Sequence, residues 1–307
     1  MNNVKKTVML FAIAIIWGYA FVAQSQGGEL AGAYTFNGLR MFCGVLFLIP
    51  VTFIRDRIAA SKGTARTYEG GSRKLWKAGI LCGVALFIAT TVQQIGLNMG
   101  TESGKAGFLT ATYILIVPIF SIFLHKKPGF NIWVGVVLAL IGLYMLCMNG
   151  EISLRSSDIL IIVCAFVFSV QILLVDHYSP YVDGIKLAMI EFLVTGMISL
   201  IPIAIFEIAP VGLTAWLSNT FRSELFIPFL FAGVFSCGIA YTLQIEAQRD
   251  YNATIASLIM SLEAVFASIF GVIFLKQYMT KRELIGAGIM FAAIIIAQLP
   301  VGVKKEV

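Results

Sequence analysis

Charged residues are scarce in this chain, and their scarcity defines the class of protein. Only 12% of its 307 residues are Asp, Glu, Lys or Arg, roughly half the ~25% that is usual in soluble domains. Hydrophobic residues make up 59%, which at about 20 per membrane-spanning helix supplies about nine spans. A soluble globule could not hide that much apolar surface. The composition therefore excludes a soluble enzyme, a nucleic-acid-binding protein and a disordered chain, and it indicates a polytopic membrane protein with short loops.

Residues that bind metals or form disulfides are few as well. The chain has five cysteines and two histidines. Every cysteine lies within an apolar run, and none has CxxC spacing or a histidine partner, so the pattern favours neither a disulfide framework nor a metal site. His125 and His177 stand at the ends of apolar runs, without the ligand spacing of known metal centres. We therefore expect no metal and no cofactor.

Long hydrophobic runs are what the chain has in abundance. Most have about 17–23 residues, enough to cross ~30 Å as helices that rise 1.5 Å per residue. Since irregular backbone cannot face lipid, we expect an all-α integral membrane protein with ten transmembrane helices. The ten runs are Val8–Ala23, Tyr34–Ile54, Leu75–Ile95, Ala106–Leu124, Ile132–Met148, Ile159–Val175, Ile185–Phe206, Leu225–Ile245, Ala253–Leu275 and Leu284–Val301.

The first run, Val8–Ala23, has a second interpretation. It follows Lys5-Lys6 and ends in small residues, as a cleaved signal peptide would. Trp17-Gly18 within the run is unusual for a discarded leader, and nine further runs follow. We therefore interpret it as a retained span.

The distribution of Lys and Arg predicts the side of the membrane on which each loop lies. With the N-terminus inside, fifteen of the 22 basic residues fall in inner segments and six in outer segments, while Arg40 lies within a span. Seven of the fifteen lie in the loop Arg55–Lys77. We interpret this loop as a topology determinant that can touch anionic lipid, rather than as a site for a protein partner. Although the loop Lys276–Glu283 argues the other way, the excess places both termini in the cytoplasm, for a multi-pass protein of the plasma membrane.

Matching residues recur about 150 positions apart. Gln94 and Gln244 stand near the ends of the third and eighth runs at an offset of 150. Arg40 and Glu191 lie 151 residues apart in the second and seventh runs. These matches predict an internal repeat.

A cut near residue 150 gives halves 1–150 and 151–307 with five apolar runs each. Since five is odd, the second half must enter the membrane upside down relative to the first. Inverted repeats of this kind are typical of secondary transporters, whose substrate site lies near the midplane between the halves.

Several short motifs, in this order and spacing, resemble the EamA-type transporters of the drug/metabolite transporter superfamily. The resemblance covers nearly the whole chain, although each motif alone is weak. The motifs are Trp17-Gly18, Leu39–Phe42, Gln93–Asn98, Lys105–Thr110, Tyr113–Pro118 and Ser261–Phe266.

The resemblance implies a ten-helix carrier built from two inverted five-helix repeats. Such carriers move small metabolites, often amino acids or related compounds, outward by alternating access. Two positions depart from the family pattern: Ala264 stands where proline is frequent, and Leu275-Lys276-Gln277 replaces Leu-Gly-Glu. The departure at Ala264 leaves a bend in the ninth helix in doubt, whereas Pro118 keeps one in the fourth.

Ionisable residues at lipid depth are costly and are therefore functional candidates. Glu263 lies near the middle of its run, and Arg40 and Glu191 lie about a third of the way along theirs. Glu263 could couple transport to protons or bind a substrate ammonium group, because a low-dielectric site favours its protonated form; alternatively it is a neutral structural residue. Arg40 could hold a substrate carboxylate or pair with a helix end or a buried carboxylate. The same choice between coupling and structure applies to Glu191.

Amide side chains gather in the same spans. Gln93, Gln94 and Asn98 cluster at the end of the third run, Gln244 matches them on the eighth, and Gln171 lies in the sixth. From mirrored places these amides could bind one ligand. The alternative is hydrogen bonding between helices, worth about 0.6 kcal/mol on average.

Aromatic and small residues complete the set of candidates. Trp17, Tyr113 and Tyr241 could wall a cavity with apolar faces and polar edges, or could serve as ordinary packing or an interfacial belt. Gly135 and Gly288, each with an alanine four residues later, allow close helix packing within the fold or in a homodimer.

We therefore expect a secondary active transporter that exports small metabolites such as amino acids, with a site at the midplane and the option of proton coupling. An integral-membrane enzyme is the first alternative, but the sequence has no DDxxD, HxxxH or Ser-His-Asp set, and we expect no enzymatic activity. A receptor or scaffold is the second alternative, and it would not need mirrored polar groups inside the membrane.

Overall fold

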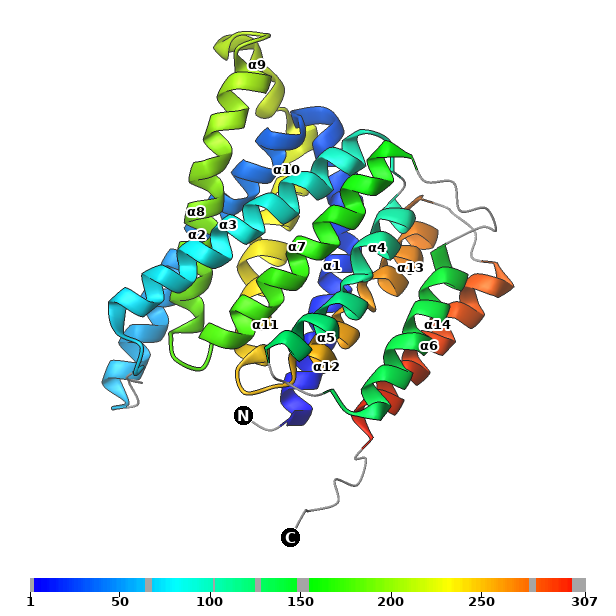
Figure 1. Cartoon of the computed structure of the whole chain (residues 1–307). Helices are drawn as coiled ribbons and strands as arrows, with labels where there is room; N and C mark the ends of the chain where they lie inside the picture. The colour runs from blue at the N-terminus through cyan, green and yellow to red at the C-terminus, as the bar shows by residue number, and fades with distance from the viewer. Residues whose placement is uncertain are drawn as a thin grey trace.

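The computed structural model describes residues 3–63, 68–101, 103–124, 128–147, 155–275 and 280–299, so that His125 lies outside the described ranges. Every regular element in these ranges is a helix (Figure 1). A helix pairs its backbone groups within one segment, as lipid requires. In chain order the elements are α1 (Asn3–Ala31), α2 (Ala33–Ser61), α3 (Gly71–Asn98), α4 (Ser103–Ala111), α5 (Tyr113–Phe123), α6 (Phe130–Cys147), α7 (Ser156–Tyr178), α8 (Gly184–Pro202), the π-helix η1 (Ile203–Ile208), α9 (Leu213–Thr220), the 3-10 turn η2 (Ser223–Leu225), α10 (Phe226–Leu230), the π-helix η3 (Phe231–Tyr241), α11 (Thr242–Gln248), α12 (Ala253–Met260), α13 (Glu263–Leu275) and α14 (Lys281–Gln298).

Eight helical segments in the described ranges are long and apolar enough to cross a membrane. They correspond to the first four predicted runs and to the sixth through ninth. The fifth run forms α6, whose apolar part, Phe130–Leu146, is shorter. The tenth run forms α14, which opens on three charged residues, Lys281, Arg282 and Glu283. The all-helical, multi-pass architecture is thus confirmed, whereas the count of ten transmembrane helices stays a prediction.

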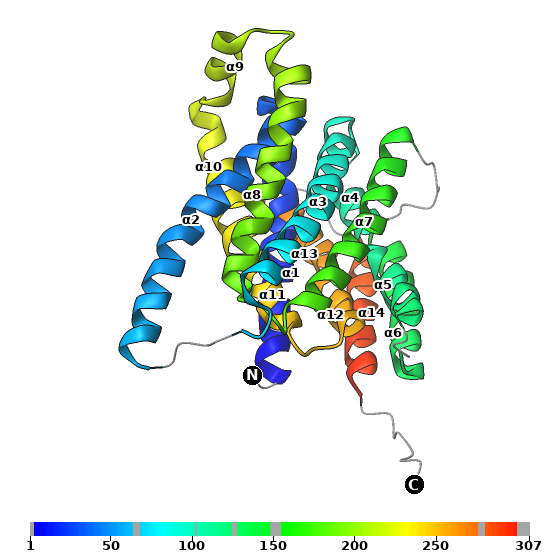
Figure 2. The same cartoon turned by 60° about the vertical axis from the view of Figure 1, so that its left-hand side comes forward.

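The two halves of the chain run in opposite directions through one bundle. α1 begins and α14 ends at the same end of the molecule, and α9 lies at the opposite end (Figures 1 and 2). α1 and α7, the first helices of the two halves, point in opposite directions (Figure 1). α1 also packs against α13, η3 and α11 of the second half. The two halves therefore interleave with opposite orientations.

Two spans are interrupted near their middles. α4 ends at Ala111 and α5 begins at Tyr113, while α12 ends at Met260 and α13 begins at Glu263. α4 packs against α13 and α5 against α12, so the interruptions lie beside each other in the interior. The ninth run is therefore broken even though Ala264 stands there in place of a proline.

Hydroxyl side chains supply a local reason for both interruptions. Thr112 Oγ1 donates to the Leu109 carbonyl oxygen at 2.5 Å, and Ser261 Oγ donates to the Leu258 carbonyl oxygen at 2.8 Å. The backbone N–H groups of Thr112 and Leu262 also bond to carbonyls three residues back, rather than four. Side-chain bonds to preceding carbonyls compete with the α-helical ladder and bend helices. The sequence thus breaks these spans without a proline at the break.

Helices α6 and α14 pack along each other through small residues (Figure 1). A Cβ added to Gly142 would lie 2.7 Å from the Gly286 carbonyl oxygen, and one added to Gly135 would lie 2.8 Å from Ala297 Cβ. Only glycine allows so close an approach of two helices. Gly135 thus serves a contact within the fold. A Cβ added to Gly288 would meet no atom of another described element within 4 Å, and a homodimer through Gly288 stays a prediction.

The predicted orientation can be checked by labelling from outside the cell. Ser61 ends α2 and Ser218 lies in α9, and both are exposed at opposite ends of the bundle. If the loop Arg55–Lys77 is cytoplasmic, Ser61→Cys should resist a membrane-impermeant maleimide in intact cells, while Ser218→Cys should react. The unsubstituted protein gives the background from its own cysteines. Labelling of Ser61→Cys and protection of Ser218→Cys would reverse the orientation.

Candidate functional site

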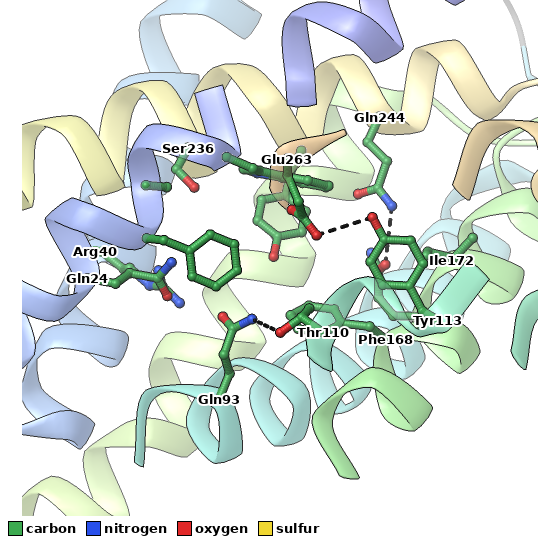
Figure 3. Close-up of a pocket in the computed structure, with 15 residues that line it drawn as sticks. Gln24, Arg40, Gln93, Thr110, Tyr113, Phe168, Ile172, Ser236, Gln244 and Glu263 are labelled. Atoms are coloured by element: carbon green, nitrogen blue, oxygen red, sulfur yellow. Dashed lines mark hydrogen bonds between the residues drawn. The ribbon is translucent and has the colours of Figure 1, made fainter. Parts of the chain in front are cut away.

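A small cavity lies where the two halves meet. Its lining comes from α1, α2, α3, α4 and α5 of the first half and from α7, η3, α11 and α13 of the second (Figure 3). The space open to the centre of a water-sized molecule is about 40 Å³, room for about three waters at ~10–15 Å³ each. A ligand larger than a few waters would therefore need a wider cavity. It is lined by Trp17, Ala20, Phe21, Gln24, Arg40, Gln93, Thr110, Tyr113, Phe168, Gln171, Ile172, Ser236, Tyr241, Gln244 and Glu263.

Glu263 lies in the cavity wall at the interruption of the ninth span. It is the first residue of α13 and is 4% exposed. Its Oε1 accepts a hydrogen bond of 3.2 Å from the hydroxyl of Tyr113, the first residue of α5 (Figure 3). The N-terminus of α13 favours a negative charge at this place. The two partners are 150 residues apart, so equivalent positions of the repeats meet in one hydrogen bond.

Arg40 brings a buried cation to the same cavity. Its side chain extends from α2 and the residue is 3% exposed. Nε and Nη2 donate to Asn37 Oδ1 at 3.2 and 2.8 Å, and Asn37 Nδ2 donates to Thr91 Oγ1 at 2.9 Å. Among the described residues Arg40 forms no ion pair. Because an unpaired buried charge is costly, often by several kcal/mol, this guanidinium is suited to receive an anion.

The positive and negative groups occupy different parts of the cavity. Arg40 lies with Gln24 on one side, and Glu263 lies with Tyr113 and Gln244 on the other (Figure 3). Neither Arg40 nor Glu263 pairs with a charged side chain in the described part of the chain. The lining therefore offers one cationic and one carboxyl group to a ligand that bears both charges.

Amides and aromatic rings form the rest of the wall. Gln93 Nε2 donates to Thr110 Oγ1 at 3.0 Å, and Gln244 Nε2 donates to Gln171 Oε1 at 3.3 Å (Figure 3). The rings of Trp17 and Tyr241 pack with centroids 4.9 Å apart. Eight of the eleven residues singled out from the sequence thus surround one cavity.

Gln94 and Asn98 lie outside this lining and join α3 to α1 instead. Gln94 Nε2 donates to the Gln24 carbonyl oxygen at 2.9 Å and to Asn98 Oδ1 at 3.0 Å, and Asn98 Nδ2 donates to the Gly28 carbonyl oxygen at 2.8 Å. A Cβ on Gly28 would lie 2.2 Å from Gln94 Nε2 and 2.3 Å from Asn98 Oδ1, so a larger residue there would displace these two amides. The geometry favours the interhelical alternative for these two amides.

Glu191, the third residue outside the lining, is fully buried on α8. Its Oε1 accepts a hydrogen bond of 2.9 Å from Gln171 Nε2. Although Arg40 occupies the related position in the first half, no ion pair joins them. Glu191 is therefore connected to the cavity lining by its hydrogen bond to Gln171.

Several cavity residues are not among those chosen from the sequence. Gln24 stands seven residues after Trp17, on the same face of α1, so helical periodicity could have identified it. Thr110 precedes Tyr113 by one turn across the helix break. Ser236 shares the cavity with Tyr241 because η3 is a π-helix, in which residues five apart lie near one face. No pattern in the sequence signals that π-helix.

The structure of the contact between α1 and α3 predicts the effect of removing one amide. Gln94→Ala should lower the free energy of unfolding by about 1 kcal/mol, since interhelical hydrogen bonds in membranes are worth about 0.6 kcal/mol on average and up to about 1.7. Ligand binding per folded molecule should change little. The measurement is thermal melting beside binding, with Gln244→Ala as the matched amide inside the cavity. Lost binding with unchanged melting in Gln94→Ala would place that amide in the site.

Comparison with known proteins gives the family. The model of the EamA-like transporter family matches the chain twice, over residues 5–148 and 155–298. An "Uncharacterized transporter" of Archaeoglobus fulgidus is 30% identical over 95% of this chain and 85% of its own. "Uncharacterized transporter YoaV" of Bacillus subtilis is 24% identical over 92% of this chain and 93% of its own. A solved structure described as "Crystal structure of protein" covers 97% of both chains with a TM-score of 0.74 and 16% identity, which shows a shared fold. The chain therefore belongs to the EamA-like transporter family of multi-pass membrane proteins, in agreement with the resemblance of its motifs.

Proposed function

We propose that this protein is a secondary active transporter of the plasma membrane that exports small zwitterionic metabolites, amino acids above all, by alternating access. The observation that carries the proposal is the pair of buried groups in one cavity, Arg40 from the first half and Glu263 from the second. A zwitterion would neutralise both groups at once: its carboxylate would face the guanidinium and its ammonium group the carboxylate. Charge-assisted hydrogen bonds of this kind are about twice as strong as neutral ones.

The remaining wall suits the side chain of such a substrate. Trp17, Phe168, Ile172 and Tyr241 offer apolar surface around the polar groups. Ligand sites commonly combine a mostly apolar lining with a few placed polar groups. The mixture supports amino acids with apolar or aromatic side chains as the first compounds to test.

Ion pairs between the halves support alternating access. At the end where α1 begins, Arg55 of α2 pairs with Asp183 at the start of α8 at 2.7 Å. At the other end, Lys105 of α4 pairs with Asp158 of α7 at 2.6 Å. Each pair joins one half of the chain to the other, so that breaking one and keeping the other would open the cavity to a single side.

The pair at the α4–α7 end can be tested with a cysteine that the chain already carries. Cys164 is fully buried on α7, and its Sγ lies 3.7 Å from Thr110 Oγ1 in the cavity wall. In a protein whose other cysteines are replaced by alanine, Asp158→Asn should raise the rate of maleimide labelling at Cys164 about tenfold. Removal of one partner of a buried ion pair weakens a contact by several kcal/mol.

The matched control is Asp56→Asn at the opposite end, where Asp56 accepts from Arg55 and pairs with Lys186 at 3.0 Å. This variant should leave the labelling of Cys164 from the α4–α7 side unchanged or slower. Equal labelling rates in both variants and in the parent would show that the pair does not close that end.

Binding tests the substrate class directly. The twenty protein amino acids would be screened by thermal shift against the purified protein, each beside its analogue without the amino group and its analogue without the carboxylate. An amino acid at 100 times its Kd should stabilise the protein by about 2.7 kcal/mol, and both analogues should stabilise it less. If none of the twenty raises the melting temperature, the proposed substrate class is wrong.

A further inference from the structure

A chain of hydrogen bonds runs from the cavity to a second buried carboxyl group. Gln244 of α11 donates from Nε2 to Gln171 Oε1 at 3.3 Å, and Gln171 of α7 donates from Nε2 to Glu191 Oε1 at 2.9 Å. Gln244 and Gln171 line the cavity, whereas Glu191 on α8 does not. All three residues are no more than 1% exposed. These two hydrogen bonds therefore link the cavity wall to the Glu191 carboxyl group, which lies outside the cavity lining.

The hydrogen bond to Glu191 gives the series of amides a direction. An amide group both donates and accepts, and a carboxyl oxygen accepts. Glu191 Oε1 accepts from the NH₂ group of Gln171, which leaves the Gln171 oxygen facing Gln244. Gln244 must therefore donate from its own NH₂ group to the Gln171 oxygen. Its oxygen is then left over, and Gln244 Oε1 is buried without a hydrogen-bond partner in the described part of the chain.

An unpartnered acceptor in a binding cavity selects for a ligand that donates. A buried polar atom without a partner costs about 1–3 kcal/mol, which a bound N–H group would recover. Gln244 lies on the same side of the cavity as Glu263, the carboxyl group proposed to face the substrate's ammonium group (Figure 3). The two acceptors would together take hydrogen bonds from one ammonium group, which has three N–H donors.

We propose that Glu191 is a positioning residue for substrate selection: it fixes the orientation of two successive amides and thereby presents Gln244 Oε1 as an acceptor for the substrate's amino group. This inference rests on the proposed function as a carrier of amino acids. It deepens that function, because it assigns the preference for an amino group to a residue outside the cavity. A structural role alone would weaken all ligands alike, whereas an orienting role changes the preference between ligands.

The measurement is a ratio of two affinities, obtained with purified protein in nanodiscs. The probes are the amino acid that gives the largest thermal shift with the parent protein and its analogue without the amino group. Glu191→Gln keeps the size of the side chain but can donate as well as accept, so the amide chain can reverse and turn the NH₂ group of Gln244 toward the cavity. The preference for the amino acid over its analogue should then fall about tenfold, the equivalent of one hydrogen bond to a charged group.

A swap of the two side chains provides the rescue. In Glu191→Gln combined with Gln171→Glu, the carboxylate stands at 171, accepts from both neighbouring amides and again leaves the Gln244 oxygen facing the cavity. The pair has the same composition and net charge as the parent, and it should regain most of the preference. Gln244→Leu removes the acceptor itself. It should lower the preference as far as Glu191→Gln does, and combining the two should lower it no further.

The outcomes separate the inference from the proposed function. If the parent binds none of the twenty amino acids, the proposed function fails. If the parent binds them but Glu191→Gln keeps the parent's ratio, the inference is wrong and the function stands. Equal weakening of both probes would also overturn the inference, because it would assign Glu191 to stability alone. If Glu191→Gln does not fold, the other two variants decide. The inference requires that the swapped pair keeps the parent's ratio of affinities and that Gln244→Leu lowers it. Any other result for these two variants would overturn the inference.

Discussion

Replacing Glu263 with Gln is expected to abolish accumulation of substrate driven by a pH gradient, while exchange of substrate across the membrane continues. Glu263 is 4% exposed, lies at the interruption between α12 and α13, and has the hydroxyl of Tyr113 as its hydrogen-bond donor. Burial disfavours a carboxylate ion, so the group should be neutral in one state and ionised when the cavity opens to water or an ammonium group arrives. A glutamine keeps the size but cannot release a proton. Exchange need not move a proton and therefore continues, although the loss of the charge-assisted hydrogen bond to the substrate's ammonium group raises the substrate concentration that it needs.

Proteoliposomes with and without a pH gradient provide the measurement for Glu263. The parent should concentrate a labelled amino acid in response to the gradient, and Glu263→Gln should reach only the equilibrium level, a loss of the whole gradient-driven component. Tyr113→Phe is the matched control, because it removes the hydrogen bond of 3.2 Å and keeps the carboxyl group; it should retain coupling. If Glu263→Gln still concentrates substrate, another group couples transport to protons.

Replacing Arg40 with Gln should weaken binding of an amino acid by ten- to a hundredfold, the size expected from the loss of about 1.5–3 kcal/mol for hydrogen bonds to a charged group. Arg40 is 3% exposed in the cavity and bonds only to Asn37 among the described residues. The loss should appear for every ligand that carries a carboxylate. The amine that lacks the carboxylate should bind equally well to the parent and to Arg40→Gln, because it never used the guanidinium.

Isothermal titration of the amino acid and of the matching amine separates this role of Arg40 from a structural one. Arg40→Lys should recover part of the affinity, since a lysine keeps the charge but not the planar, bidentate donor geometry of arginine. Weaker binding of the amine in Arg40→Gln would show instead that the guanidinium supports the fold of α2.

The main features of the fold follow from the sequence. Runs of apolar residues have to be helices in lipid, and all of them contain helices in the described ranges. The offset of 150 residues that relates Gln94 to Gln244 is also the separation of Tyr113 and Glu263, which meet in a hydrogen bond. The number of membrane spans is harder to predict from the sequence, because an apolar run can begin with charged residues. α14 begins with Lys281, Arg282 and Glu283, and such a turn fits the membrane interface as well as a soluble loop.

Residues on the cavity wall were harder to predict than the cavity itself. Polarity at lipid depth selects Gln93, Gln171 and Gln244, and all three line the cavity. Polarity also selects Gln94, which stands next to Gln93 but bonds to α1 instead. Composition alone does not tell which face of a helix meets which neighbour. The break in the ninth span coincides with a hydroxyl hydrogen bond of Ser261 rather than with a proline, and the segment Phe231–Tyr241 forms a π-helix. Neither leaves a pattern in a single sequence.

Counterflow in proteoliposomes tests the central claim, that this protein carries zwitterionic metabolites through a cavity between its two halves. Vesicles loaded with a high concentration of the amino acid that gives the largest thermal shift would be diluted into buffer with a trace of the labelled compound. The account predicts a transient accumulation of label. The account also predicts that the accumulation is inhibited far more strongly by other amino acids than by analogues without the amino group or without the carboxylate, and that it is lost in Arg40→Gln. The absence of counterflow for all twenty amino acids, or equal inhibition by the amino acid and both analogues, would contradict it.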